Sequence, residues 1–293
     1  MADLLRVGGA TSSRHEIVAL STTTLLRGRL VALLRQRFEQ RLVVIQAGAG
    51  FGKSTLLAQA VRENRLEQLG IDVVLRVVQS DRDPAQLLGD LGTALGLSDG
   101  DVTVDRLADA VWGRAPEAVA LVVDDAHRLE DAEAAWQVLR DLLERLPSNG
   151  HLVVSGRRPP RLPTARLLSR DEAIVLGERD LAFDDDELAE MAALRSIPEE
   201  LAAELPRWPA LVTLTGAVGR SASIDYLWDE VLRRLDDERR RLPVRRDRRR
   251  PGPRPRRLAP GVGSRRRRAP GRRDRGRFVP TPRPVGRLSL IHI

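Results

Sequence analysis

The sequence predicts an α/β fold in which helices cover both faces of a mostly parallel sheet, followed by a small arm made only of helices. Three observations lead to this prediction. Short β-branched and apolar runs, typical of buried strands, alternate with segments of helical periodicity up to residue 178. A glycine-rich loop joins the first of these strands to the helix after it. From Asp184 onward the periodicity is helical alone.

The sheet and its helices follow from these local patterns. The predicted strands are residues 41–46, 71–78, 118–123, 151–155 and 173–176. The helices predicted around them are residues 24–40, 54–64, 84–95, 104–112 and 130–146. The helix over 84–95 has a clear start, because Asp83 can accept hydrogen bonds from the first turn and Pro84 fits the first helical position.

Four parts are expected along the chain. They are an N-terminal extension over residues 1–23, the sheet domain over 24–178, a helical arm over 179–240 and a disordered basic tail over 241–293. The arm is predicted from helical segments at 184–195, 197–206, 208–219 and 223–240. The tail lacks apolar periodicity and cannot build a core.

Charge is unevenly distributed over the 293 residues. The net charge is +8, yet residues 239–293 hold 21 arginines and two acids, while the residues before them have a balance of −11. The absence of cysteine excludes disulfides and thiolate metal sites. The chain shows neither a secretory signal nor an apolar run of the roughly 18 residues that span a bilayer. We therefore expect a cytoplasmic protein with no membrane partner.

One lysine stands among 48 arginines, and it is Lys53. The segment around it fits the pattern Gly/Ala-x4-Gly-Lys-Ser/Thr of a phosphate-binding loop, placed between a strand and a helix as the motif requires. Glycines let the backbone N–H groups turn toward phosphate oxygens at the positive end of the following helix. The compact ammonium of Lys53 would reach the β and γ phosphates. The predicted nucleotide-binding residues are Ala47, Gly48, Ala49, Gly50, Phe51, Gly52, Lys53, Ser54 and Thr55.

The ligand predicted for this loop is ATP or ADP with Mg²⁺, and the fold is that of a P-loop NTPase. The Ser54 hydroxyl would ligate Mg²⁺, and Thr55 would contact the α phosphate side. The alternative is a glycine-rich turn that binds nothing.

A second group of candidate residues ends the apolar run 120–123. A buried strand that delivers an acid at its carboxyl end, beside a phosphate loop, places the carboxylate near Mg²⁺. We predict that Asp124 holds the metal through water and that Asp125 orients an attacking water, so both are candidate catalytic residues. The alternative is an ordinary Asp-Asp turn.

A third candidate follows the strand 151–155. Arg157 could contact the γ phosphate and distinguish ATP from ADP, with Arg158 as a rival for this role. Arginines after strands are usually solvated, which is the alternative interpretation. His127 is interpreted as a loop residue without a catalytic part.

In this order, the elements resemble those of the MalT-like branch of the STAND ATPases, the large LuxR-type transcriptional regulators of bacteria. The resemblance covers residues 20–238. The segments that carry it are Leu26–Leu30, Gln46–Leu57, Leu121–His127, His151–Pro160, Leu181–Glu187 and Trp208–Ala210. Arg207 departs from the family, which has glycine before Trp-Pro, and this puts the local turn in question.

The resemblance implies a nucleotide-controlled switch. Pro209 would touch the nucleotide from the arm and hold a closed, ADP-bound state. An inducer and ATP would release the arm, and the protein would self-associate to activate transcription, with slow ATP hydrolysis as a reset. Family members continue into a sensor array and a helix-turn-helix domain, so DNA would be bound only through a C-terminal domain that this chain lacks.

Two other function classes fit the same motifs. A loader or remodelling ATPase would need rapid turnover and an arginine from a neighbouring subunit. A free-standing nucleotide-gated interaction module would need neither. The preference for adenine rests on the resemblance, together with the lack of a guanine-reading Asn/Thr-Lys-x-Asp segment.

The basic tail has two interpretations. It could be a nucleic-acid arm that engages phosphates with little sequence selectivity, although Phe278 is its one aromatic residue. We favour out-of-frame translation of GC-rich DNA. The amphipathic helix ends abruptly at Glu238–Arg241. In addition, Leu288–Ile293 is the peptide that CTGTCTCTTATACACATC, a transposon end used in library preparation, would encode.

Overall fold

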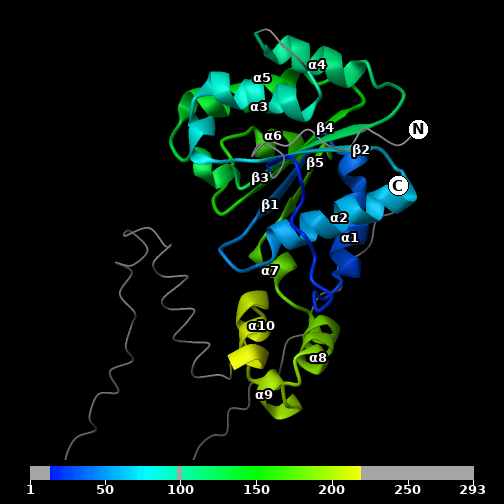
Figure 1. The fold of residues 1–293 in the computed structure, drawn as a ribbon, viewed down its shortest axis with the longest axis vertical. Helices are drawn as coiled ribbons and strands as arrows, with labels where there is room; N and C mark the ends of the chain where they lie inside the picture. The colour runs from blue at the N-terminus through cyan, green and yellow to red at the C-terminus, as the bar shows by residue number, and fades with distance from the viewer. Residues whose placement is uncertain (1–13, 98–100, 219–293) are drawn as a thin grey trace, which may run out of the picture. The chain divides into compact units, whose positions relative to one another are not determined.

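The computed structural model describes residues 14–97 and 101–218, which belong to one compact unit. Five parallel strands form one sheet in the order β2-β3-β4-β1-β5. The strands are β1 (Leu42–Gln46), β2 (Ile71–Arg76), β3 (Val119–Asp124), β4 (Gly150–Gly156) and β5 (Ala173–Leu176). The predicted α/β fold class with a parallel sheet is confirmed, and each predicted strand lies within two residues of the observed one (Figure 1).

Helices cover both faces of this sheet, as predicted (Figure 1). One face packs against α3 (Pro84–Ala94), α4 (Val104–Trp112) and α5 (Glu133–Arg145). The other packs against α1 (Gly28–Leu34), the 3₁₀ helix η2 (Arg35–Phe38) and α2 (Lys53–Glu67). Short helices η3 (Gln79–Arg82), η4 (Ala126–Leu129), α6 (Thr164–Leu168) and α7 (Glu178–Leu181) lie in the connections.

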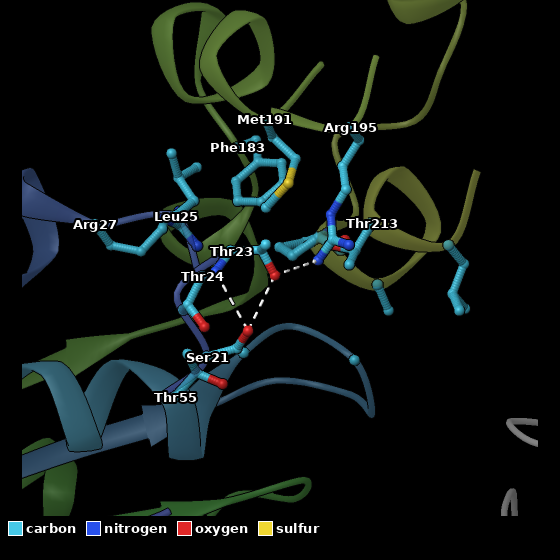
Figure 2. Close-up of a pocket in the computed structure, with 15 residues that line it drawn as sticks. Ser21, Thr23, Thr24, Leu25, Arg27, Thr55, Phe183, Met191, Arg195 and Thr213 are labelled. Carbon is cyan, nitrogen blue, oxygen red and sulfur yellow. Dashed lines mark hydrogen bonds between the residues drawn. The ribbon is translucent and has the colours of Figure 1, made fainter. Parts of the chain in front are cut away.

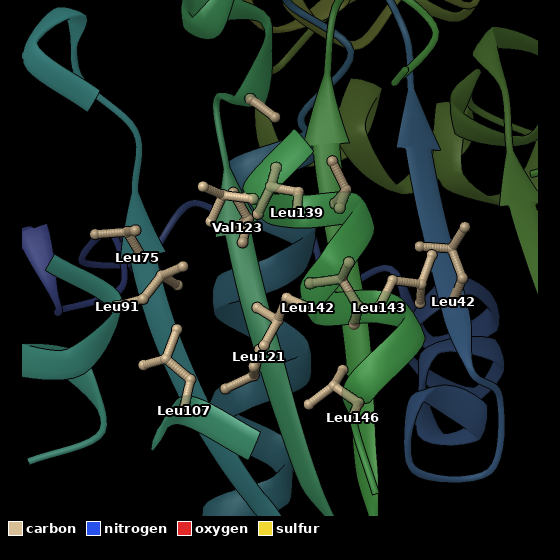
Figure 3. Close-up of a cluster of buried hydrophobic side chains, with 14 of the residues drawn as sticks. Leu42, Leu75, Leu91, Leu107, Leu121, Val123, Leu139, Leu142, Leu143 and Leu146 are labelled. Atoms are coloured by element: carbon tan, nitrogen blue, oxygen red, sulfur yellow. The ribbon is translucent and has the colours of Figure 1, made fainter. Parts of the chain in front are cut away.

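The strands divide their side chains between two cores. Leu121 and Val123 lie in the cluster with α3, α4 and α5 (Figure 3), whereas Ala120 and Val122 lie in the cluster with α1 and α2. This division follows from the two-residue period of a strand. Because both faces of the sheet are buried, β3 is apolar from Val119 to Val123. Its last residue, Asp124, is polar and lies at the carboxyl end of the strand.

The helix predicted over residues 24–40 is partly wrong. Helix α1 begins at Gly28 and is followed by η2, while residues 24–27 are not helical. The physical reason is tertiary: Leu25 is buried in the core of the arm, and the Arg27 N–H donates to Gln59 Oε1 on α2 at 2.9 Å. These contacts replace the backbone hydrogen bonds that a helix over residues 24–27 would make, as the apolar periodicity of the segment predicts.

The arm contains α8 (Asp185–Leu194), α9 (Glu199–Ala203) and α10 (Pro209–Val218). They lie within the predicted helices 184–195, 197–206 and 208–219, although α9 is half as long as predicted and residue 219 is outside the described residues. Its own apolar cluster includes Phe183, Met191 and Val212. The predicted helix over 223–240 and the basic tail lie outside the described residues. Within the residues that are described, no helix is both long and apolar enough to cross a membrane.

Candidate nucleotide-binding site

The glycine-rich loop lies between β1 and α2, as its sequence predicts. Gly50 and Gly52 have φ angles of +79° and +77°, a backbone conformation that L-residues with a side chain rarely adopt. Helix α2 begins at Lys53 and has no side-chain cap at its first turn. An uncapped helix start leaves backbone N–H groups available to an anion, which favours phosphate binding. The Gly48 N–H of the loop donates to Glu178 Oε1 at 2.9 Å, so this carboxylate occupies one donor of the loop.

Lys53 lies over the beginning of this loop. Its ammonium donates to the carbonyl oxygens of Ala47 and Gly48, each at 2.8 Å. Burial lowers the pKa of Lys53, and the charge of Arg157 lowers it further, while Asp124 and Asp125 oppose the shift. The lysine is thus surrounded by the polar groups from the ends of β3 and β4, although they are distant in sequence.

Asp124 is the buried carboxylate of the site. Its Oδ1 accepts hydrogen bonds from the Ser155 hydroxyl on β4 and from the Asp125 N–H, the latter at 2.9 Å. Ser54 and Asp124 line the same small recess, so the two predicted Mg²⁺ ligands lie near each other. The described residues contain no group of three or more His, Cys, Asp or Glu side chains placed so that they could hold a metal ion. A Mg²⁺ ion here would therefore depend on one hydroxyl, one carboxylate and oxygens of the nucleotide or water.

Sequence reasoning missed Ser155. It is fully buried on β4, and its bond to Asp124 spans two adjacent strands. A serine within an apolar strand could have pointed to it, because a buried hydroxyl needs a hydrogen-bond partner.

Asp125 follows in a left-handed backbone conformation with φ of +59°. Aspartate tolerates this conformation better than most residues, and such strain is common at functional sites. The carboxylate lies 3.8 Å from Nδ1 of His127. Burial, and next the charge of Arg157, lower the pKa of His127 to about 4. His127 is therefore neutral at pH 7, and it lies on η4 beside Gly156 at the carboxyl end of β4.

Arg157 comes directly after β4 and is half-buried. Its charge acts on both Lys53 and His127, which places the guanidinium on the phosphate-loop side of the sheet edge. This position suits the predicted contact with the γ phosphate better than that of the exposed Arg158.

The arm contacts the phosphate loop directly. The Trp208 indole N–H donates to the Ala49 carbonyl at 3.1 Å, and the Ala210 N–H donates to the Gly50 carbonyl at 3.0 Å. Pro209, between these two residues, lines a pocket together with Gly50. The questioned turn is regular, because Arg207 is not among the non-glycine residues with positive φ. The Arg207 carbonyl accepts from the Phe183 N–H at 2.8 Å, so glycine is not required there.

A pocket of about 510 Å³ extends from the loop between the N-terminal segment and the arm (Figure 2). Its walls include the apolar side chains of Leu25, Phe183 and Met191. Arg195 reaches from the arm toward Thr23 and donates to its hydroxyl at 3.3 Å (Figure 2). The volume lies in the range of small-molecule pockets, and the lining combines apolar with polar side chains. Of the residues that line it, the sequence predicted Gly50, Gly52, Thr55 and Pro209 as nucleotide-binding, but not the residues that precede α1 or the apolar side chains of the arm, because these come from distant parts of the chain.

The structure brings the candidate residues of β1, β3, β4 and the arm together around one loop. The roles predicted for Ala47–Thr55, Asp124, Asp125, Arg157 and Pro209 stay predictions, as do the expected domain boundaries.

Comparison with known proteins agrees with this geometry. The protein-family profile described as an AAA domain matches residues 35–158. The HTH-type transcriptional regulator MalT of Serratia proteamaculans is 27% identical over 265 residues, covering 76% of this chain and 28% of that protein. MalT of Vibrio cholerae is 30% identical over 181 residues, covering 56% of this chain and 19% of that protein. Over these residues the chain is similar in sequence to MalT-type regulators.

The MalT-type relatives are much longer than this chain, which spans less than a third of their length. Among solved structures, the Walker-type ATPase PABY2304 of Pyrococcus abyssi has a similar fold, with a TM-score of 0.52 at 13% identity over 75% of this chain and 77% of that one. The AAA-domain match and the similarity to MalT agree with an ATP-binding P-loop domain, and the Walker-type ATPase shares its fold.

Proposed function

We propose that this chain is the nucleotide switch of a MalT-type transcriptional regulator, which binds ATP and ADP with Mg²⁺. The observation that carries the proposal is the direct contact of the arm with the phosphate loop through Trp208 and Ala210. A ligand on this loop and the position of the arm therefore influence each other. A nucleotide shifts the arm between its docked and released positions if it binds the protein more tightly in one of them.

In this proposal each group at the site has a defined part. Lys53 leaves the carbonyls of Ala47 and Gly48 for the β and γ phosphates. Ser54 and Asp124 hold Mg²⁺, which neutralises phosphate charge when bound. Asp125 orients the attacking water.

The remaining groups distinguish and enclose the nucleotide. Arg157 contacts the γ phosphate, and Pro209 contacts the nucleotide from the arm. The pocket of about 510 Å³ takes the nucleoside, with its base among the apolar side chains of Leu25, Phe183 and Met191. ADP then favours the docked arm, and the γ phosphate of ATP favours its release.

The output of the switch is inferred from the relatives. Release of the arm leads to self-association and activation of transcription in a longer protein that binds DNA through another domain. Hydrolysis serves to reset the switch, so we expect a turnover slower than about one per second, at the low end of enzyme rates. Faster hydrolysis would favour a loader or remodelling ATPase.

Calorimetric titration of ATP, ADP and GTP tests the binding step. Replacing Lys53 by alanine removes charge-assisted bonds, so the Kd for ATP should rise about 10- to 150-fold. Arg62→Ala is the matched control, because Arg62 is an exposed cation on the same helix, α2. Equal affinity of wild type and Lys53→Ala would refute the proposed site.

A further inference from the structure

Two carbonyl groups of the phosphate loop are held by the arm. They are the Ala49 carbonyl, which accepts from the Trp208 indole N–H, and the Gly50 carbonyl, which accepts from the Ala210 N–H. The two carbonyls before them in the loop accept from the Lys53 ammonium. The Trp208 bond joins residues separated by 159 positions in the sequence. The conformation of the loop therefore depends in part on a segment outside the sheet.

These bonds bear on phosphate binding because a peptide unit is planar. Its carbonyl and its N–H point in opposite directions, so holding the carbonyls of Ala49 and Gly50 toward the arm turns the following N–H groups away from it. Phosphate is bound by such convergent N–H groups. A loop already held in this conformation loses less entropy when the anion binds.

The packing at this contact is close. A Cβ atom on Gly50 would lie 2.6 Å from the Ala210 Cβ and 2.8 Å from Trp208 Nε1. The Phe51 and Trp208 rings stack with centroids 6.2 Å apart and an interplanar angle of 29°. The indole is thus fixed by a ring of the loop itself, with its N–H directed at the Ala49 carbonyl.

We propose that Trp208 is a positioning residue for the phosphate loop, through which the docked arm raises the affinity of the loop for phosphate groups. This inference rests on the proposed function, since it concerns the same loop. It differs from a contact between arm and nucleotide, because the described residues that line the nucleoside pocket include Pro209 and Ala210 but not Trp208. Trp208 acts on the protein backbone and not on the ligand.

The test is Trp208→Phe in the full chain, which removes the indole N–H while leaving an aromatic ring against Phe51. ADP, inorganic pyrophosphate and adenosine are titrated separately. Loss of one hydrogen bond to the loop should raise the Kd for ADP and pyrophosphate about 2- to 12-fold and leave that for adenosine unchanged. Trp112→Phe is the matched control, because Trp112 is 58% exposed on α4.

Each contrary result has a distinct meaning. If Trp208→Phe binds ADP and pyrophosphate as tightly as wild type, the indole N–H does not position the loop. If the Kd for adenosine rises by the same factor as that for ADP, Trp208 shapes the nucleoside pocket or the arm, and the inference is wrong. A wild-type chain that binds ADP no more tightly than adenosine would overturn the proposed function and this inference with it.

Discussion

At the scale of residues, the site depends on hydrogen bonds between a few polar groups. Lys53 is the one lysine of the chain and bonds to carbonyls of its own loop. Asp124 is buried and bonded by Ser155 through one carboxylate oxygen, Oδ1. The bond to Ser155 therefore fixes the orientation of the other carboxylate oxygen, Oδ2. Hydrogen-bond partners that orient a metal ligand in this way raise the affinity of the site for the metal.

Ser155→Ala should weaken the predicted Mg²⁺ site without preventing folding. We expect the Mg²⁺ concentration needed for half-maximal ATP binding to rise by about 10-fold or more, because Asp124 loses the partner that orients it. A Mg²⁺ titration at fixed ATP measures this. Ser169→Ala is the control, since the exposed Ser169 hydroxyl bonds only locally, to the Arg166 carbonyl at 2.8 Å. An unchanged Mg²⁺ dependence in Ser155→Ala would contradict the role of Asp124 in holding the metal.

His127 makes stability depend on pH. Burial lowers its pKa from 6.5 to about 4, so between these values the unfolded chain binds more protons than the folded one. Its contribution to stability is therefore complete above pH 6.5 and is lost as the pH falls toward 4. The thermal unfolding midpoint of wild type should drop more between pH 7 and 4.5 than that of His127→Gln. Parallel pH profiles for the two proteins would show that His127 keeps an ordinary pKa in the folded state.

At the scale of elements, one buried ion pair links the segment before α1 to the arm. Arg27 is 5% exposed and Glu187, on α8, is 8% exposed. Their closest contact is 2.8 Å. The Arg27 guanidinium also donates to the carbonyls of Leu181 and Ala182 and lies 4.9 Å from the centre of the Phe183 ring. This network explains why the segment 24–27 is not helical.

Arg27→Ala should destabilise the chain strongly, because the buried Glu187 carboxylate loses both of its 2.8 Å bonds to Arg27 and keeps a longer ion pair with Arg29, at 3.3 Å. The expected loss in free energy of unfolding is about 3–5 kcal/mol. Arg145→Ala is the comparison, since the Arg145–Asp105 pair is exposed and worth about 0–1 kcal/mol. Urea unfolding measures both, and a double variant with Glu187→Ala should lose less than the sum of the two single losses. Similar losses for Arg27→Ala and Arg145→Ala would exclude the network as a structural link.

At the scale of the whole molecule, charge separates the chain into two unlike parts. Residues 239–293 carry a balance of +19, and the residues before them one of −11. Polyphosphate ligands and nucleic acids can therefore associate with the tail without entering the phosphate loop.

Removal of residues 241–293 should separate these two kinds of binding. The shortened chain should lose salt-dependent binding to duplex DNA, because most of the 21 arginines are removed, and should keep its affinity for ADP. Fluorescence anisotropy at several salt concentrations measures the first, and calorimetry the second. Persistent DNA binding by the shortened chain would place a nucleic-acid surface on the body.

Much of the fold could be predicted because its determinants are local. The apolar runs of the five strands, the Asp83–Pro84 helix start and the glycine-rich loop each lie within a few consecutive residues. The Asp83 carboxylate indeed accepts from the Ala85 N–H at 3.0 Å. The candidate residues at the ends of β1, β3 and β4 could be proposed to lie together for a similar reason, since carboxyl ends of parallel strands share one edge.

The sequence by itself therefore determined the parallel sheet, the phosphate loop and the positions of Lys53 and Asp124. Only the tertiary structure decided that the arm is docked on that loop through Trp208, and that residues before α1 share a pocket with it. Periodicity reports which face of an element is buried, not against which distant segment it packs. Contacts such as Trp208 to Ala49 depend on the packing of the whole chain, and they connect the nucleotide site to the arm.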